Sequence, residues 1–227
     1  RSYSVTGVQT CALPIYTDLS GWRRATGNPG SEGHWRVLER GPNGSPCLEF
    51  HSGEYTNWDT RMSPDLPVYG AGHDLLVLAA KGDPQTTQMA VEMQEEDGSR
   101  WIATAALTPE WQRIALPLSA FHYWQDSPTK GSRGGAGDAL EPARTRRIGF
   151  GLANTHTPGL RTGAHAFRIA ELGTAVDPGA GLERGGDRFE QSLETIHPRY
   201  KVYSVTDPVS LRPAGWLGGL PAEGPDP

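Results

Sequence analysis

The chain has 227 residues and a formal net charge of −5, from 26 acidic and 21 basic side chains. This charge argues against sequence-independent nucleic-acid binding, which requires a basic surface, and no apolar run approaches the roughly 20 residues that cross a bilayer. Glycine and proline are abundant, at 29 and 19 residues, and runs of strong helix formers are few. The composition therefore predicts an all-β domain with many turns.

The first residues differ in character from the rest. Residues 5–15 (VTGVQTCALPI) resemble the translation of an adapter oligonucleotide used in short-read DNA sequencing. The alternative is the end of a signal peptide, but a basic start and an unbroken apolar run are both missing. We expect residues 1–15 to be a non-native segment, so the sequence says nothing about a targeting signal. Without Cys11, Cys47 has no partner for an internal disulfide.

Cys47 falls in an extended apolar pattern, PCLEFH, and is predicted to be a small buried residue of a strand. The alternative is a reactive thiol, which would need a basic neighbour such as His51, on the same strand face but four residues away.

Extended patterns follow one another along the chain. In QMAVEMQE, residues 88–95, Met89, Val91 and Met93 share one face, and the Asp97-Gly98 turn joins this segment to RWIATAA as a hairpin. In the last segment Leu172 is out of phase with Phe167 and Ile169, which predicts a bulge or a strand end. There is no repeated βαβ pattern, and eight or nine short strands favour a two-sheet sandwich. The predicted strands are 34–39, 46–51, 57–62, 75–81, 88–95, 100–106, 111–118, 146–152 and 164–172.

Two intervals, 54–69 and 122–146, are predicted to contain long loops, and the Gly-rich part of the second (TKGSRGGAGD) is interpreted as flexible. Sugar recognition needs aromatic rings to stack on pyranose faces and planar polar groups to bind hydroxyls, and EYTNWDTR, FHYWQD and ANTH offer both. For Trp58 the alternative is packing in the core. Tyr123 and Trp124 are adjacent and cannot both point inward from an extended chain, so at least one is expected to be exposed or packed by a loop. The candidate carbohydrate-binding residues are Tyr55, Trp58, Arg61, Tyr123, Trp124, Asn154 and His156.

Catalytic signatures are mostly absent from the sequence. There is no Gly-x-Ser-x-Gly elbow, no His-Glu-x-x-His and no Walker-type loop, and the seven histidines have no metal-ligand spacing. After Ala175 the composition changes: residues 177–187 read as a linker. Residues 188–227 are too few for an ordinary core, so we expect the truncated start of a second domain or, alternatively, a tail that packs on the sandwich.

The segment TPEWQRIALPLSAF, residues 108–121, resembles a phrase common in carbohydrate-binding modules of the galactose-binding-like jelly-roll type and in the related complex I intermediate-associated family. TDLSGW, AAKGD, DGSRW, RRIGFGLAN and AFRIAEL agree in order, so the resemblance spans about residues 16–176. It implies a two-sheet antiparallel β-sandwich, in which we expect Trp111 to supply a buried ring and Phe121 to anchor the chain. The resemblance also leaves a structural calcium open: Asp18 is a candidate ligand, but the final-strand position where the family often has Asp reads Ala170, followed by Glu171.

The resemblance implies non-catalytic binding of a polysaccharide or oligosaccharide, with the module targeting an attached C-terminal glycoside hydrolase outside the cell or in the periplasm. No cofactor is required for such binding. The alternatives are a structural domain that packs on a catalytic domain without binding sugar, a fragment of a hydrolase whose active site lies beyond Pro227, and an assembly factor of the intermediate-associated type.

Overall fold

The computed structural model describes residues 19–177, apart from 29 and 39, together with three short strands at 11–12, 201–203 and 213–216. Residues 1–177 and 178–227 form two units, and each is described by itself. In the second unit, β13 (Lys201–Tyr203) and β14 (Pro213–Trp216) pair antiparallel. The non-native segment at 1–15, the linker at 177–187 and the nature of residues 188–227 stay predictions.

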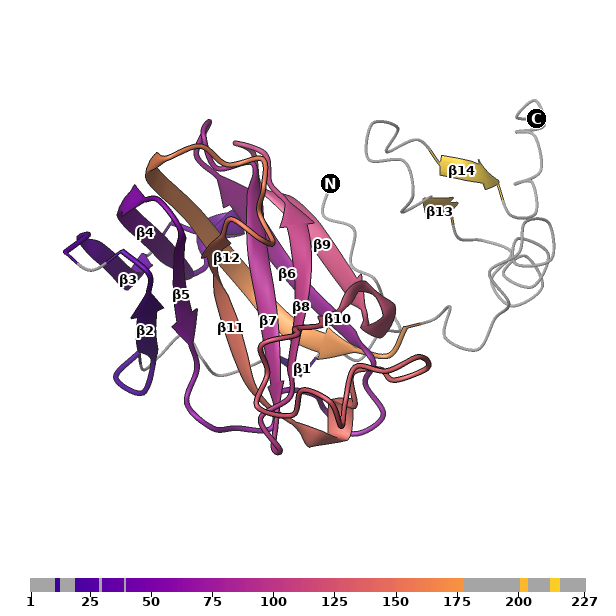
Figure 1. Cartoon of the computed structure of the whole chain (residues 1–227). Coiled ribbons are helices and arrows are strands. Elements are labelled where there is room, and N and C mark those ends of the chain that lie inside the picture. The colour runs from indigo at the N-terminus through magenta and orange to yellow at the C-terminus, as the bar shows by residue number, and fades with distance from the viewer. Residues whose placement is uncertain are drawn as a thin grey trace, which may run out of the picture. The chain divides into compact units, whose positions relative to one another are not determined.

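The first unit consists of two antiparallel six-stranded sheets that face each other, and β7, β8 and β11 lie in front of β6 and β12 in Figure 1. Sheet A has the order β3-β4-β12-β6-β9, and β1 also pairs with β12. Its strands are β1 (Cys11–Ala12), β3 (Gly33–Leu38), β4 (Cys47–Tyr55), β6 (Leu75–Gly82), β9 (Gln112–Pro117) and β12 (Gly163–Ala175). Sheet B has the order β10-β8-β7-β11-β5-β2. Its strands are β2 (Arg23–Thr26), β5 (Trp58–Met62), β7 (Gln88–Glu95), β8 (Arg100–Ala106), β10 (His122–Tyr123) and β11 (Thr145–Ala153).

This architecture confirms the predicted all-β sandwich. All nine predicted strands are present in the two sheets, and β1, β2 and β10 are additional. Three short 3-10 helices interrupt the strands: η1 (Pro42–Gly44), η2 (Leu118–Ala120) and η3 (Pro142–Arg144). Among the described residues there is no helix with the length and apolar character needed to cross a membrane.

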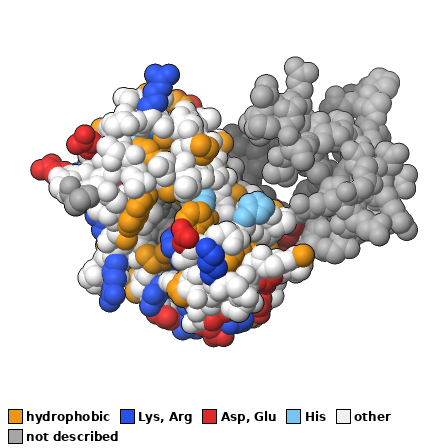
Figure 2. All heavy atoms as spheres, in the orientation of Figure 1, with side chains coloured by type: hydrophobic (Ala, Val, Ile, Leu, Met, Phe, Trp, Pro, Cys, Tyr) orange, Lys and Arg blue, Asp and Glu red, His pale blue; other side chains and the backbone are white. Residues whose placement is uncertain are grey.

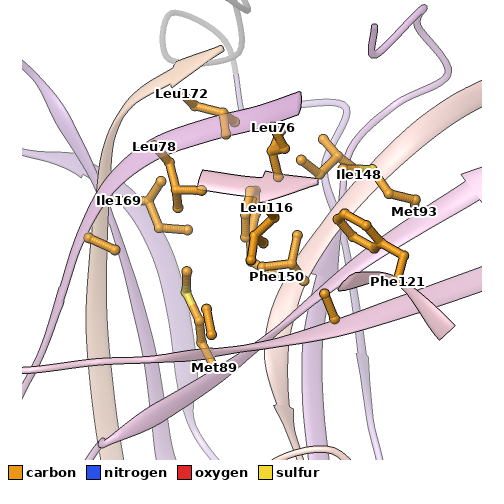
Figure 3. Packing of buried hydrophobic residues seen from close by; sticks show 14 of the residues in the cluster. Leu76, Leu78, Met89, Met93, Leu116, Phe121, Ile148, Phe150, Ile169 and Leu172 are labelled. Atoms are coloured by element: carbon orange, nitrogen blue, oxygen red, sulfur yellow. The ribbon is translucent and has the colours of Figure 1, made fainter. Parts of the chain in front are cut away.

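The core lies between the inner faces of the two sheets, where alternate residues of each strand meet (Figure 3). Met89, Val91 and Met93 of β7 all point into it, as the period-two pattern predicts. Phe50 of β4 and Phe167 of β12 stack with ring centroids 4.5 Å apart. Each fully buried side chain of this size stabilises the fold by about 2 to 3 kcal/mol.

The last strand of sheet A contains the predicted irregularity. The pairing register between β12 and β6 shifts between Ala170 and Gly173, and Glu171 has a φ of +50°. The extra residue restores the phase, so Leu172 joins the core with 1 % exposure. The prediction of a bulge at this position is confirmed.

Two expectations about individual residues require correction. Trp111 is not a buried core ring: it is partly exposed, on the outer face of sheet A, beside the small apolar cluster of Cys47, Ala79 and Ala170. Trp111 immediately precedes β9, and its position in the alternation of that strand directs the side chain to the outer face of sheet A, away from the core. Phe121, in contrast, is 4 % exposed and anchors the chain in the core, as expected. The interval 54–69 is also not a loop throughout, because it contains β5.

The Gly-rich segment after β10 has defined contacts that its composition did not predict. The guanidinium of Arg133 binds Glu95 at 2.7 Å and Asp138 at 2.9 Å and lies 5.6 Å from the centroid of the Trp101 ring. Gly134 has a φ of +79°, and a Cβ there would overlap the ring of Tyr123. Glycine is therefore needed at this position, and the segment is held against sheet B by an arginine and its carboxylates.

Candidate functional site

The outer face of sheet B presents the side chains that alternate with the core residues. Cross-strand pairing brings a row of small residues together across five of its strands. This small-residue row consists of Ala25, Thr60, Gly151, Ala90 and Thr104, in spatial order. Larger side chains of the neighbouring row, including Met62, Glu92, Ile102 and His122, stand beside it. Figure 2 shows this side of the molecule, where histidine side chains reach the surface between apolar and charged groups.

The small-residue row ends in a pocket of about 510 Å³ at the β8 side of the sheet. Ile102 and Thr104 of β8 form its floor. One wall comes from the chain around η2 and β10, and the other from the loop that follows β11. Its remaining lining residues are Gln88, Ala120, His122, Tyr123, Thr155, His156 and Pro158. None of the lining residues is a carboxylate, so the pocket lacks the pair of acids by which most glycosidases work.

The loop after β11 forms a wall because it docks on the two strands beneath it. Thr157 closes a tight turn, donating from its backbone N–H to the carbonyl of Ala153 at 2.6 Å. The hydroxyl of Thr104 donates to the carbonyl of His156 at 2.5 Å, and the N–H of Gly159 donates to the side-chain oxygen of Gln88 at 3.2 Å. The pocket is therefore made by contacts between residues about 50 to 70 positions apart in sequence.

His156 and Trp124 form the aromatic part of the site. Their rings meet edge to face, with centroids 4.6 Å apart. Burial lowers the pKa of His156; the charge of Arg100 adds to this lowering and that of Glu92 opposes it, so the neutral imidazole is favoured. Its Nε2 atom is buried and has no hydrogen-bond partner in the described part of the chain. A neutral imidazole nitrogen without a partner can donate to or accept from a ligand hydroxyl, depending on its tautomer.

A charged pair lies beside this aromatic pair. Glu92 is 7 % exposed, and Arg100 holds it with two hydrogen bonds, of 2.5 Å from Nε and 2.9 Å from Nη2. The one carboxylate and the one guanidinium neutralise each other in a fork-to-fork arrangement. The charges of this pair beside the pocket are consequently balanced.

The structure separates the seven candidate residues into three groups. Trp124 and His156 contact each other at the site, and Tyr123, whose ring packs on Trp101 at 5.4 Å, reaches the pocket edge. Tyr123 packs against the core, whereas Trp124 is partly exposed and contacts His156, so the two adjacent residues do not both point inward. Asn154 is exposed on the loop that carries His156.

Trp58 is partly exposed and lies on the same outer face, at the far side of the small-residue row, where it covers Gly27. Tyr55 and Arg61 are 2 % and 3 % exposed, so neither offers a surface to a ligand. Arg61 binds Asp59 at 2.5 Å inside the sandwich and lies over the ring of Phe50. We leave Tyr55 and Arg61 out of the site proposed below.

The sequence analysis did not single out several of the pocket residues: Gln88, Ile102, Thr104, His122 and Thr155. Gln88 and Thr104 occupy outward positions of the predicted hairpin, and that alternation was the available signal. The described residues contain no group of three or more His, Cys, Asp or Glu side chains placed to hold a metal ion. Asp18, the candidate calcium ligand, lies outside the described residues.

The described residues of the first unit therefore form a jelly-roll sandwich with a polar and aromatic pocket on one sheet. No protein-family model matches the chain, and no curated protein matches its sequence.

Solved structures with a similar fold include carbohydrate-binding modules. One is a family 11 module from Clostridium thermocellum in complex with a β-1,3-1,4-mixed-linked tetrasaccharide, with a TM-score of 0.57 and 16 % identity over 74 % of this chain and 95 % of that module. Another is the family 11 module of the cellulosomal cellulase Lic26A-Cel5E from the same organism, with a TM-score of 0.56 and 16 % identity over 76 % and 97 %. At this identity the likeness establishes the fold.

Proposed function

We propose that the sandwich binds a neutral saccharide, without catalysis, on the outer face of sheet B. The observation that carries the proposal is the buried, unpartnered Nε2 atom of His156 beside the ring of Trp124, at the edge of a 510 Å³ pocket. A sugar offers hydroxyl groups for the imidazole and an apolar ring face for the indole. The fold shared with modules of which one holds a tetrasaccharide supports the same reading.

A neutral ligand is favoured because the carboxylate beside the site is already neutralised by Arg100. Hydroxyls would find further partners in the side chains of Gln88, Thr155 and His122. We further propose that such binding serves to hold an attached glycoside hydrolase near its polysaccharide, outside the cell or in the periplasm.

The competing function is a structural domain that packs on a catalytic domain and binds no sugar. Full burial of Trp58, Tyr123 and Trp124 would favour it, but all three are only partly buried. The proposal of sugar binding is therefore the better supported of the two.

Calorimetric titration of the whole chain with neutral oligosaccharides, beginning with the mixed-linked β-glucan tetrasaccharide, tests the proposal. We expect a Kd at or below about 1 mM, equivalent to about −4 kcal/mol. Trp124→Ala should weaken binding about three- to tenfold, because an aromatic contact contributes about 0.5 to 1.5 kcal/mol. His156→Phe keeps the ring contact but removes the nitrogen and should also weaken binding. Trp111→Ala, on the other sheet, is the matched control.

Two results would contradict the proposal. One is the absence of binding by any neutral oligosaccharide at about 10 mM, where even a ligand of −3 kcal/mol would be detected. The other is binding that is the same in Trp124→Ala as in the unmodified chain.

A further inference from the structure

The outer face of sheet A carries a row of charged residues that the proposed sugar site does not use. Register pairs Arg36 of β3 with Glu49 of β4, Glu49 with Arg168 of β12, and Arg168 with Lys81 of β6. At the end of this row the ammonium of Lys81 lies 5.7 Å from the centroid of the Trp111 ring. We call Arg36, Glu49, Arg168, Lys81 and Trp111 the basic row.

Glu49 is the only carboxylate of the basic row, and its hydrogen-bonding capacity is taken up. Arg36 donates to it at 3.0 and 2.6 Å, Arg168 at 2.8 Å from both Nε and Nη2, and the ring of His34 lies 3.2 Å from it. The side chain of Glu49 is 8 % exposed. The buried carboxylate of Glu49 thus pairs with two arginines and makes no ion pair with Lys81.

Lys81 makes no ion pair with any residue in the described part of the chain, and its cross-strand neighbour Arg168 has the same sign. Like charges placed directly opposite each other on a sheet are destabilising. Three cations face one carboxylate, which leaves two unit charges uncompensated in a protein whose formal net charge is −5. The nearby Arg113 adds no excess, because Glu171 binds it at 2.9 Å.

An aromatic ring lies at one end of the basic row, and a hollow lies near the other. At one end Trp111 is partly exposed beside Cys47, Ala79 and Ala170. Near the other end lies a hollow of about 440 Å³, which no residue of the basic row lines; its lining is Arg24, Glu32, Gly33 and the stacked rings of His34 and His51, so it contains one carboxylate. Side-chain exposures of 58 % for Arg36 and 34 % for Arg168 leave guanidinium nitrogens open to an incoming group.

We propose that this face is a second ligand site, which binds an acidic glycan of the uronate type. The carboxylate of a uronic acid would lie between Lys81 and Arg168, and the apolar face of a neighbouring sugar ring would contact Trp111. A cation beside an aromatic ring matches a ligand that combines an anion with an apolar ring face. Duplex nucleic acid, with one charge per about 1.7 Å, is too densely charged for a row with two unpaired cations.

The experiment is a calorimetric titration of the whole chain with an oligogalacturonate, with poly-glutamate of equal charge as the comparison ligand. Lys81→Gln should weaken oligogalacturonate binding about fivefold, as expected for loss of up to about 1 kcal/mol of ion pairing. Arg113→Gln removes a cation from the same face whose charge is already paired, and it should change the affinity less than about twofold. Trp111→Ala should weaken binding about threefold or more through loss of the ring contact.

The proposal is overturned if oligogalacturonate does not bind at about 10 mM, a limit of roughly −3 kcal/mol. It is also overturned if poly-glutamate binds as tightly and Trp111→Ala has no effect, because the face would then recognise acidic protein. Trp124→Ala, which disables the proposed neutral-sugar site, should leave oligogalacturonate binding intact. The two proposals can therefore fail separately.

Discussion

The two sheets of the sandwich have the same number of strands and each places one nearly buried glutamate on its outer face, yet the surroundings of these glutamates differ. Glu92 on sheet B is 7 % exposed and binds Arg100, while Glu49 on sheet A is 6 % exposed and binds Arg36, Arg168 and His34. Glu92 has one arginine partner, whereas Glu49 has two. The sign of each face is thus set by the neighbours of the glutamate and not by the glutamate itself.

The difference has its origin in topology. Glu92 and Arg100 belong to one hairpin and are eight positions apart. Glu49 joins β3 to β12, and Arg168 is 119 positions away. Within the β7–β8 hairpin, one arginine balances one glutamate. On sheet A, Glu49 has an arginine on each neighbouring strand, so one positive charge of the two arginines is not balanced. One fold therefore presents a balanced ion pair on one face and an excess of cations on the other.

The largest expected effect contrasts the buried cation that supports sheet B with an exposed one on sheet A. The side chain of Arg133 is 12 % exposed and that of its partner Glu95 is fully buried. Arg133→Ala should lower the free energy of unfolding by about 3 to 5 kcal/mol, because it leaves a buried carboxylate without its cation. Arg113→Ala on sheet A, where the arginine is 71 % exposed, should cost about 0 to 1 kcal/mol. Urea unfolding of both variants measures the difference, and equal losses would contradict it.

The pH dependence of the free energy of unfolding should reflect the lowered pKa of Glu49. Burial alone would raise the pKa of Glu49, but hydrogen bonds from Arg36, Arg168 and His34 lower it from 4.5 to about 2. A lowered carboxyl pKa contributes stability above the unfolded-state value, and this contribution is lost as the pH falls from about 5 to about 2. About 2 to 3 kcal/mol should disappear over that range.

Denaturant titrations at several pH values measure this loss. Glu49→Gln should flatten the acid limb, and Arg36→Gln should flatten it partly, because one of the bonds that lower the pKa is gone. An acid limb of unchanged slope in Glu49→Gln would show that the pairing does not control the pKa.

Salt should separate the two faces in binding. If the basic row binds an acidic glycan, its affinity should fall severalfold between about 0.05 and 0.5 M NaCl, because exposed charges are screened over a shorter distance. Neutral-sugar binding at the site on sheet B should change less than twofold over the same range. The same calorimetric titrations at two salt concentrations give both values. A neutral-sugar affinity that falls as steeply would remove the distinction between the faces.

The smallest effect concerns Cys47, which lies next to the basic row. It is fully buried, and burial raises the pKa of its thiol despite the opposing influence of Arg168. A thiol reagent should leave Cys47 unmodified in the folded chain and react once urea is added. Reaction of the folded protein at the rate of an exposed thiol would favour the alternative of a reactive cysteine.

Periodicity and turn chemistry were enough to predict the strands and the bulge in β12, because these depend on local alternation. The expectation that Trp111 is buried came from the family resemblance and not from alternation, and it was wrong because Trp111 shares the outward phase of Arg113. Arg61 looked like a polar group for a sugar, but the phase of β5 points it inward, where Asp59 compensates its charge. For this strand the rule that charged residues face outward gave the wrong side.

The candidate site was predictable only in its aromatic part. The argument that adjacent Tyr123 and Trp124 cannot both point inward needs no structure, and the role of these residues in binding stays a prediction. The pocket itself depends on the loop after β11 lying over β7 and β8 through Gln88 and Thr104. No pattern in the sequence of either segment specifies that contact.

The small-residue row of sheet B runs across strands and not along them, and this gives the surface a repeat. Neighbouring strands are about 4.8 Å apart, close to the length of one sugar ring in a linear chain. If the proposed function is correct, each successive ring of a glycan extending from the pocket at Thr104 toward Ala25 would meet the next strand. Affinity should then grow with oligosaccharide length until the ligand reaches β2, and longer chains should gain nothing more.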